Sequence, residues 1–255
     1  MTFLEIVAVL LAGTAAGTIN AVVGSGTLIT FPTLLALGMP PVLANVSNNV
    51  GLVPGAAAGA FGYRRELAGQ KQRLIRLGSA SILGSFGGAA ALLLLPEEVF
   101  AGVVPVLIAL GCVLVILQPR ISRAVEARAV ANGRERPEHG ALWVWVLVLL
   151  CGVYGGYFGA AQGVLLVAVL GVGLSQSMQR NNAAKNVLAS LNNGVAALVF
   201  IAVTDVDWLI AGLIAIGSTI GGFLGASVGR RLPPLALRIV IVVVGAVAIA
   251  MFLFN

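Results

Sequence analysis

Apolar stretches of the chain alternate with short turns that are polar or rich in glycine. The ten stretches expected to form helices cover residues 3–23, 27–37, 42–63, 77–95, 99–117, 141–158, 164–174, 182–203, 208–228 and 235–254. A helix needs about 20 apolar residues to cross a bilayer, and all but two of these stretches approach that length. The pattern therefore predicts an all-α protein, a polytopic transmembrane helical bundle that also contains two short segments.

The composition supports the same fold class. Hydrophobic residues make up 59% of the 255 residues and charged residues only 9%, whereas soluble domains carry about 25% charged residues. Too few charges remain to cover a water-facing surface, which argues against a soluble enzyme, a disordered chain or a disulfide scaffold. The net charge of +6 is attributed to basic cytoplasmic loops rather than to nucleic acid as a partner. We expect a multi-pass protein of the cytoplasmic membrane, surrounded by the lipid bilayer.

The two halves of the sequence match each other at a constant offset of 137 residues. Glycine, asparagine, phenylalanine and proline recur together, which chance similarity between apolar stretches would not produce. The matched pairs include Gly26/Gly163, Leu28/Leu165, Asn45/Asn182, Asn49/Asn186, Gly84/Gly221, Phe86/Phe223, Gly88/Gly225 and Pro96/Pro233. We therefore expect two transmembrane repeats of about five segments each, residues 1–118 and 141–255, joined by a basic cytoplasmic linker over 119–140 within one membrane domain.

Charge and the number of crossings determine the expected topology. In each half the first long segment and the short one after it return to their starting side, whether they span twice or dip part-way. Three full segments follow, so each half crosses the membrane an odd number of times and the second repeat is inverted relative to the first. With the 64–76 loop inside, all 15 basic residues lie on the inner side, and the outer side keeps Glu5, Glu97, Glu98, Asp205 and Asp207. The rival topology, with re-entrant short segments, places outside Arg180, Lys185, Arg230, Arg231 and Arg238. The positive-inside rule favours the first topology, with both termini outside.

The two short segments are candidate half-helices. Eleven helical residues reach about 16 Å, roughly half the hydrocarbon thickness. A helix N-terminus inside the membrane offers free N–H groups and a positive dipole end, which suit an anion. The tips that would supply these donors are Gly24, Ser25 and Gly26 in the first half, and Gln162 and Gly163 in the second. The alternative is that these glycines only allow tight turns and close packing.

Amides recur in the segment after each short helix. The positions that would contribute side chains are Asn45, Asn48 and Asn49 in the first half, and Asn182, Lys185 and Asn186 in the second. Asparagines four residues apart share one helix face, and polar residues in spans usually face the bundle interior. Lys185 is the one cation of this set and would neutralise an anionic substrate. The alternative is that Lys185 extends to the inner interface.

Mid-segment Pro54-Gly55 and Asn192-Asn193-Gly194 predict either a local unwinding or a simple kink. The sequence lacks a Ser/His/Asp set, a Cys/His metal spacing and a phosphate-binding loop. We therefore expect no catalytic residues, no metal and no cofactor, and a membrane hydrolase or ATP-driven pump is disfavoured.

The motifs resemble the TauE/SafE sulfite exporter family, also called the TSUP family. The resemblance rests on Gly24-Ser25-Gly26, on 31–38 (FPTLLALG) and on 44–49 (ANVSNN) in the first half. In the second half it rests on Gly155 to Gly159 and on the stretch from Gly173 to Asn186. The resemblance implies a membrane transporter of sulfite, sulfoacetate, thiosulfate or a related organosulfur anion. The tip sequences Gly-Ser-Gly and Ala-Gln-Gly depart from a run of glycines.

The functional hypothesis is a secondary transporter, an exporter of a small sulfur-containing anion, built from inverted repeats around a midplane site. Two alternatives remain: a channel or carrier for another small solute, and a membrane-embedded enzyme or scaffold subunit. A homo-oligomer is compatible with the sequence.

Overall fold

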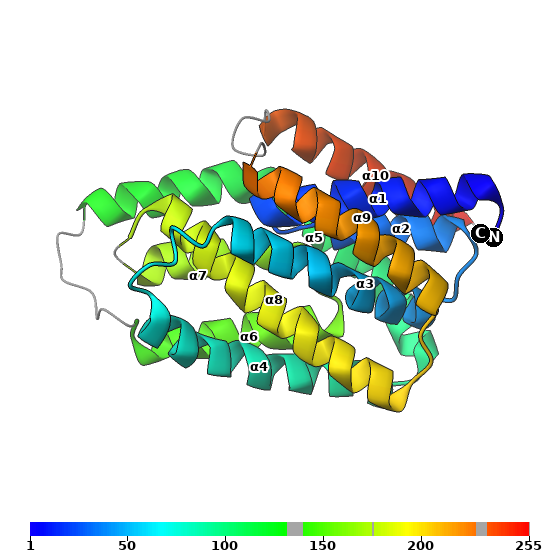
Figure 1. The fold of residues 1–255 in the computed structure, drawn as a ribbon, viewed down its shortest axis with the longest axis horizontal. Coiled ribbons are helices and arrows are strands. Elements are labelled where there is room, and N and C mark those ends of the chain that lie inside the picture. Colours follow the sequence, from blue (N-terminus) through cyan, green and yellow to red (C-terminus); the bar gives the residue numbers. More distant parts are fainter. Residues whose placement is uncertain (132–139, 175, 228–233, 255) are drawn as a thin grey trace.

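The computed structural model describes residues 1–131, 140–174, 176–227 and 234–254. All its regular elements are helices (Figure 1): α1 (Phe3–Val22), α2 (Thr27–Ala36), α3 (Pro41–Gly62), α4 (Lys71–Leu94), α5 (Glu97–Ala131), α6 (Leu142–Tyr157), α7 (Gln162–Gly173), α8 (Met178–Val203), α9 (Trp208–Ser227) and α10 (Pro234–Phe254). The prediction of an all-α bundle is confirmed.

The described helices have the length and surface of membrane spans. Five of them, α1, α4, α5, α8 and α9, are long and apolar enough to cross a bilayer. Large aliphatic side chains point away from the bundle, as at Leu94, which is 84% exposed, and Leu198, which is 71% exposed. Such extensive exposed apolar surface is rare on soluble monomers, and it is what a lipid-facing surface requires.

Three helices extend by at least one turn beyond the predicted apolar stretches. α4 begins at Lys71 and α8 at Met178, because their first turns are polar but helical. α5 continues through Pro119 to Ala131, since the alanine, arginine and glutamate residues after Ile121 are good helix formers. Part of the expected linker is therefore helical. Residues 132–139 and 228–233, with Arg134, Arg136, Arg230 and Arg231, lie outside the described residues.

The expected interruptions of the two long helices are absent. α3 is one helix across Pro54 and Gly55, and α8 is one helix across Asn192 to Gly194. The carbonyl of Asn192 accepts a 2.6 Å hydrogen bond from the Ser85 hydroxyl of α4. A Cβ at Gly55 would lie 2.5 Å from the carbonyl oxygen of Ser218 in α9. These positions therefore serve helix packing, and local unwinding was wrong.

Side chains in the loops fix where several helices begin. Thr2 and Glu5 form a capping box at the start of α1. The Ser177 hydroxyl accepts from the Arg180 amide at the start of α8, and the Asp207 carboxylate accepts from the Ile210 amide (3.0 Å) at the start of α9. Side-chain oxygens thus replace carbonyl partners that the first turn lacks.

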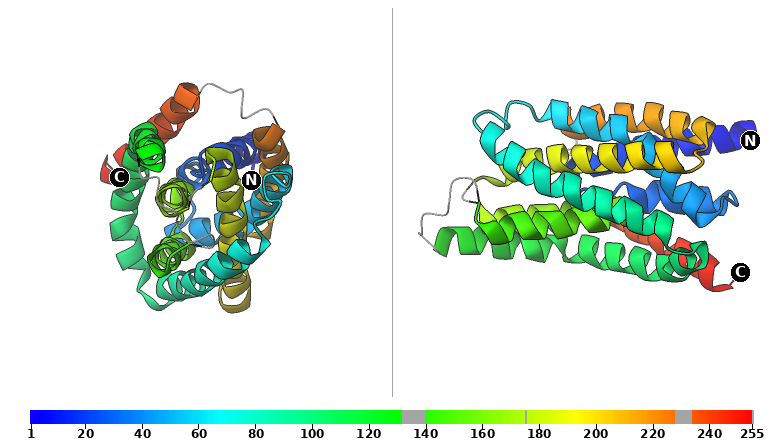
Figure 2. Two further views of the ribbon diagram at one scale, coloured as in Figure 1. Left: turned by 90° about the vertical axis from the view of Figure 1, so that its left-hand side faces the viewer. Right: turned by 90° about the horizontal axis from the view of Figure 1, so that it is seen from below.

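Two hairpins, α1–α2 and α6–α7, turn back inside the bundle. Gly24 turns the first at φ +88°, and Gly159 and Ala161 turn the second at φ +77° and +60°. The left panel of Figure 2 shows α2 (blue) and α7 (yellow-green) toward the middle of the bundle, among the longer helices. Most residues of both short helices are buried. The hairpin tips therefore place irregular backbone inside protein rather than in lipid.

Two helix pairs pack closely through glycine. α1 packs along α9, and α6 packs along α4. A Cβ at Gly84 would lie 2.2 Å from the Leu149 carbonyl oxygen of α6, and a Cβ at Gly221 would lie 2.0 Å from the Thr14 carbonyl oxygen of α1. Both contacts are backbone against backbone, the close approach that small residues permit between membrane helices.

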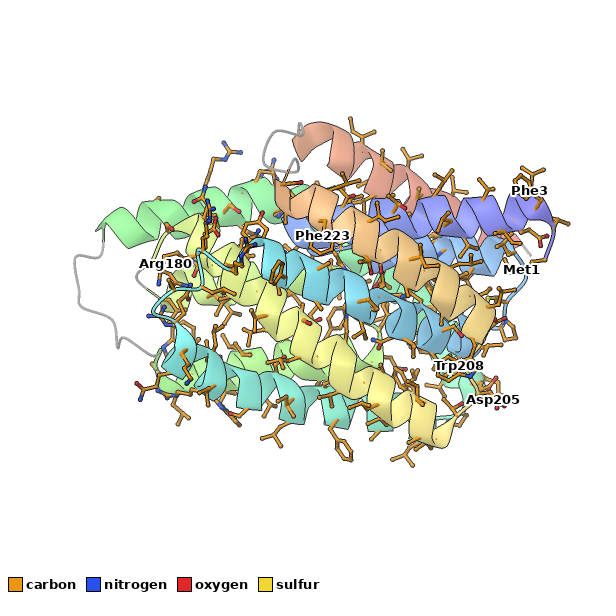
Figure 3. The ribbon with its side chains drawn as sticks, viewed as in Figure 1. Met1, Phe3, Arg180, Asp205, Trp208 and Phe223 are labelled. Atoms are coloured by element: carbon orange, nitrogen blue, oxygen red, sulfur yellow. The ribbon has the colours of Figure 1, made fainter. Side chains whose placement is uncertain are left out.

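Most of the described cations gather at one end of the bundle, which also holds Glu66. We call the end that carries the 63–70 loop and the start of α8 the basic end; it holds Arg64, Arg65, Lys71, Arg73 and Arg180. At the opposite, acidic end lie the first turns of α1 and α5 with Glu5, Glu97 and Glu98, and the 204–207 loop. Figure 3 shows Arg180 at one end and Met1, Phe3 and Asp205 at the other, and both termini lie at the acidic end in Figure 1.

Candidate functional site

The tips of the two hairpins touch each other. The Gly163 N–H, at the start of α7, donates a 3.0 Å hydrogen bond to the carbonyl oxygen of Gly24. A Cβ on either glycine would lie 2.4 Å from the Cα of the other. The contact is made by backbone alone and leaves no room for a side chain.

A small cavity lies beside this contact. Its volume is about 20 Å³, room for roughly one water molecule. The polar and glycine residues that line it come from α1, α3, α8 and both tips: Asn20, Gly24, Thr27, Gly55, Gly59, Gly159, Gln162, Gly163, Lys185, Asn186 and Asn193. Five of the eleven predicted site residues therefore share this lining: Gly24, Gln162, Gly163, Lys185 and Asn186.

The cavity lies in the middle part of the span. At 1.5 Å per residue, Lys185 lies about 10 Å and Asn193 about 22 Å from Met178, the first residue of α8. α8 has 26 residues, a length of about 38 Å from first to last residue. The two lining residues thus lie at about a quarter of the helix length and just past its centre, counted from the basic end.

Lys185 is fully buried, and its ammonium group contacts the end of α1. The Nζ atom donates to the carbonyl oxygens of Asn20 (2.8 Å) and Ala21 (3.3 Å). α1 has no basic residue in its own last turn, so Lys185 supplies from α8 the cation that suits a helix C-terminus. Lys185 therefore stays inside the bundle instead of extending to the interface.

Amides of α8 hold the same end of α1. Asn182 and Asn186 donate to the Ala21 carbonyl oxygen at 3.2 and 3.3 Å. In the first half, Asn45 of α3 donates in the same way to the Tyr157 carbonyl oxygen of α6 at 3.0 Å. The α8 amides thus donate to a carbonyl at the end of α1, in the first hairpin, and the α3 amide donates to a carbonyl at the end of α6, in the second.

Other predicted residues lie outside the cavity lining. Asn48 accepts a hydrogen bond from the Thr30 hydroxyl of α2 and is buried. Asn45 contacts α6, and Asn182 contacts α1. Ser25 Oγ and Asn49 Oδ1 are buried atoms without a hydrogen-bond partner, and such unpaired polar atoms are uncommon in native interiors.

The predicted N–H donors at the tips are engaged within the protein. The Gly26 amide donates to Asn20 Oδ1 (2.8 Å), the Gly163 amide to Gly24, and the Gln162 amide to Gly159 (3.2 Å). The Gln162 side chain donates to Asn192 Oδ1 (3.0 Å) and to the Cys151 carbonyl (3.2 Å). A ligand at the tips would have to replace these bonds.

Three polar residues of the lining were not predicted as site residues: Asn20, Thr27 and Asn193. Their counterparts at the 137-residue offset are Tyr157, Val164 and Ala56, so the repeat did not reveal them. For Asn20, the available signal was an isolated amide in an apolar span.

The chemistry of the lining is that of a donor site. A cation, amide nitrogens and a hydroxyl converge, and none of the lining residues is acidic. Among the residues that the structure describes, no three His, Cys, Asp or Glu side chains gather where they could hold a metal.

Comparison with known families decides the class of the protein. The model of the family described as "Sulfite exporter TauE/SafE" matches residues 9–252. The chain belongs to this family. Membership covers both hairpins and all ten helices in whole or in part, so the chain is a multi-pass membrane protein of the TauE/SafE transporter type.

Several curated relatives are similar over nearly the whole chain. "Probable membrane transporter protein YfcA" of Escherichia coli strain K12 is 25% identical over 245 residues, 94% of this chain and 86% of the relative. A "Probable membrane transporter protein" of Haemophilus influenzae is 22% identical and covers 95% and 92%. "Probable membrane transporter protein ORF9" of Sinorhizobium sp is 25% identical and covers 85% and 78%. No solved structure matches the chain significantly. The TauE/SafE relatives are thus named as transporters.

Proposed function

We propose that this TauE/SafE protein is a secondary transporter that exports sulfite or a related small sulfur oxyanion by alternating access. The observation that carries the proposal is the buried Lys185 ammonium beside the meeting tips of two half-helices, without an acidic residue in the cavity lining. An oxyanion would gain charge-assisted hydrogen bonds from Lys185, Asn186 and Asn193. The substrate class itself comes from the family description.

The proposed architecture is a pair of inverted repeats, residues 1–118 and 141–255, joined by residues 119–140. α3, α4 and α5 begin at Pro41, Lys71 and Glu97, and α8, α9 and α10 begin 137 residues later. The Ser81 hydroxyl of α4 donates to the Leu188 carbonyl of α8, and the Ser218 hydroxyl of α9 donates to the Gly51 carbonyl of α3, both at 2.9 Å. Ser218 is the counterpart of Ser81 at the 137-residue offset, and Gly51 is the counterpart of Leu188. The two hydrogen bonds are therefore equivalent, which supports the repeat. A site between such repeats is the usual location in secondary transporters.

The proposed orientation places the basic end in the cytoplasm. The acidic end has no Lys or Arg among the described residues of its loops, whereas the basic end carries most of the described cations. The positive-inside rule then puts both termini outside.

The cavity supports a transport cycle with an occluded stage. Sulfite has four heavy atoms, and about 20 Å³ holds roughly one water, so binding requires the tips to separate. Parting Gly163 from Gly24 would free one N–H donor and widen the space beside Lys185. Separation toward one end and then the other would give alternating access.

Sulfite flux in proteoliposomes tests the proposal. Lys185→Met removes the charge but keeps the side-chain length, and we expect a flux at least about ten-fold lower because a charge-assisted bond contributes about 1.5–3 kcal/mol. Asn193→Ala, whose side chain has no partner that would be left unpaired, should lower flux with little loss of folding. Arg76→Gln removes an equal charge at an exposed position and should keep wild-type flux.

The outcomes separate the alternatives. Wild-type sulfite flux in both Lys185→Met and Asn193→Ala would contradict the assigned site. If the protein transported another anion but not sulfite, the proposed site would stand and the proposed substrate would be wrong. Thermal unfolding of each purified variant shows whether a loss of flux reflects lost folding.

A further inference from the structure

An apolar groove opens on the outer surface near the basic end. It lies between α4 and α8, has a volume of about 590 Å³, and falls within the roughly 300–1,000 Å³ typical of small-molecule sites. Its walls are mainly aliphatic, with Leu74, Ile75, Ile82, Val187 and Leu191. Because α4 and α8 are candidate spans, this groove faces the hydrocarbon of the bilayer.

The mouth of the groove carries positive charge. Lys71 is the one charged residue of the lining, and none of the lining residues is acidic. Arg180 Nη2 is held 2.9 Å from the Ala68 carbonyl oxygen, between the lining residues Leu67 and Gly69. Lys71 is also the first residue of α4, whose N-cap Gln70 forms no side-chain capping bond, so the positive end of the α4 dipole points to the same place.

A second groove provides the contrast. It lies between α3 and α8 on the other side of Leu191, has a similar volume of about 540 Å³, and none of its lining residues is charged. Both grooves would accept a hydrocarbon chain, but the α4–α8 groove alone of these two combines an apolar bed with cations at a membrane surface. Basic pockets between transmembrane helices at the cytoplasmic surface suit anionic lipid headgroups.

We propose that the α4–α8 groove is a binding site for an anionic phospholipid of the inner leaflet, with its acyl chain against Leu74, Ile75 and Leu191 and its phosphate at Lys71. The proposal rests on the orientation proposed above, with the basic end in the cytoplasm. It is independent of the identity of the transported anion.

Native mass spectrometry of the purified protein with phosphatidylglycerol or phosphatidylcholine tests the site. We expect stronger binding of phosphatidylglycerol, and Lys71→Gln should weaken it about five-fold, the effect of about 1 kcal/mol per cation near an anionic surface. Folding should be preserved, because a cation at a helix N-terminus is not stabilising. The matched control Arg76→Gln removes the same charge from an exposed position of α4 outside the groove lining and should leave binding within about two-fold.

Filling the grooves tests the place of the acyl chain. Ile75→Trp adds bulk to an exposed residue of the α4–α8 groove and should reduce phosphatidylglycerol binding. Leu198→Trp, an exposed residue of the uncharged groove, should leave that binding unchanged.

Four results would overturn the proposal. They are equal binding of the two lipids, equal effects of Lys71→Gln and Arg76→Gln, no effect of Ile75→Trp, and a dimer of the chain that Ile75→Trp dissociates. Binding is read without transport, so loss of this inference leaves the sulfite proposal standing, and failure of sulfite flux leaves the lipid site standing.

Discussion

At the scale of single residues, Lys185 is both fully buried and cationic, and these two properties conflict in most protein interiors. A buried ammonium group is costly unless it is compensated. Here the ammonium group donates to two carbonyl oxygens at the end of α1, and the partial negative charge of a helix C-terminus is the only compensation that the described contacts provide. A partial charge leaves the site net positive, so an anion that enters beside Lys185 would complete the neutralisation.

The contact between the hairpin tips gives a prediction for Gly163. Gly163→Ala places a methyl group 2.4 Å from the Cα of Gly24, so the tips cannot close and we expect a loss of about 1–3 kcal/mol in stability together with loss of flux. Thermal unfolding and flux measure both effects.

Gly194→Ala is the matched control for Gly163→Ala. A Cβ at Gly194 meets nothing within 4 Å, and alanine favours a helix over glycine by about 1 kcal/mol. This control should be neutral or slightly stabilising. If Gly163→Ala behaved like Gly194→Ala, the backbone contact between the tips would not be part of the working protein.

At the scale of elements, the glycines divide by the helix face on which they lie. On α4, a Cβ at Gly84 would meet the backbone of α6, whereas a Cβ at Gly87 would come no closer than 4.0 Å to Val153 Cγ2. On α9, Gly221 meets α1 and Gly212 meets nothing. The close crossings therefore depend on one face of each helix.

Substitution on the two faces should separate their effects. Gly84→Ala and Gly221→Ala should each lower stability by about 1–3 kcal/mol, because the helices must move apart to fit the methyl group. Gly87→Ala and Gly212→Ala should be neutral or stabilising. Thermal unfolding in detergent compares the four, and equal stability of Gly84→Ala and Gly87→Ala would contradict the close crossing of α4 and α6.

Most helices follow from the sequence, because a span requires a long apolar stretch. The apolar pattern did not predict polar first turns such as that of α4, because these turns are helical without being hydrophobic. Five predicted residues line the cavity: Gly24, Gln162, Gly163, Lys185 and Asn186. Of these, Gly163 and Asn186 match an identical residue in the other repeat, at Gly26 and Asn49. Asn20 and Asn193 were missed because they have no amide counterpart. Asn48 was predicted for the site, but its side chain bonds Thr30 and does not line the cavity. The spacing of residues shows which face of a helix a side chain occupies, but not which neighbouring helix that face contacts.

At the scale of the whole molecule, the gathering of cations at one end of the bundle supports the orientation that the proposals require. The 63–70 loop and the 204–207 loop lie at opposite ends of the bundle. Cys112 and Cys151 are buried and unpaired, so a background without them is suited to labelling.

Cysteine labelling in intact cells tests this orientation. In a background with both native cysteines replaced by alanine, Asp205→Cys should react with a membrane-impermeant maleimide in intact cells. Ala68→Cys should react only after permeabilisation, because the proposed orientation places the basic end in the cytoplasm. The opposite pattern, or reaction of both in intact cells, would refute the proposed orientation.

The depth of the cavity has an electrical consequence. An anion held between Lys185 and Asn193 would lie roughly a third to a half of the way along α8, at 1.5 Å per residue, and thus a substantial fraction of the way across the bilayer. Moving one charge across the whole bilayer is worth about 2.3 kcal/mol per 100 mV of membrane voltage. The step into the cavity and the step out of it would each involve only part of this energy. An interior-negative cell would thereby drive a monovalent cargo outward in two moderate steps, and the voltage alone would give the protein a preferred direction.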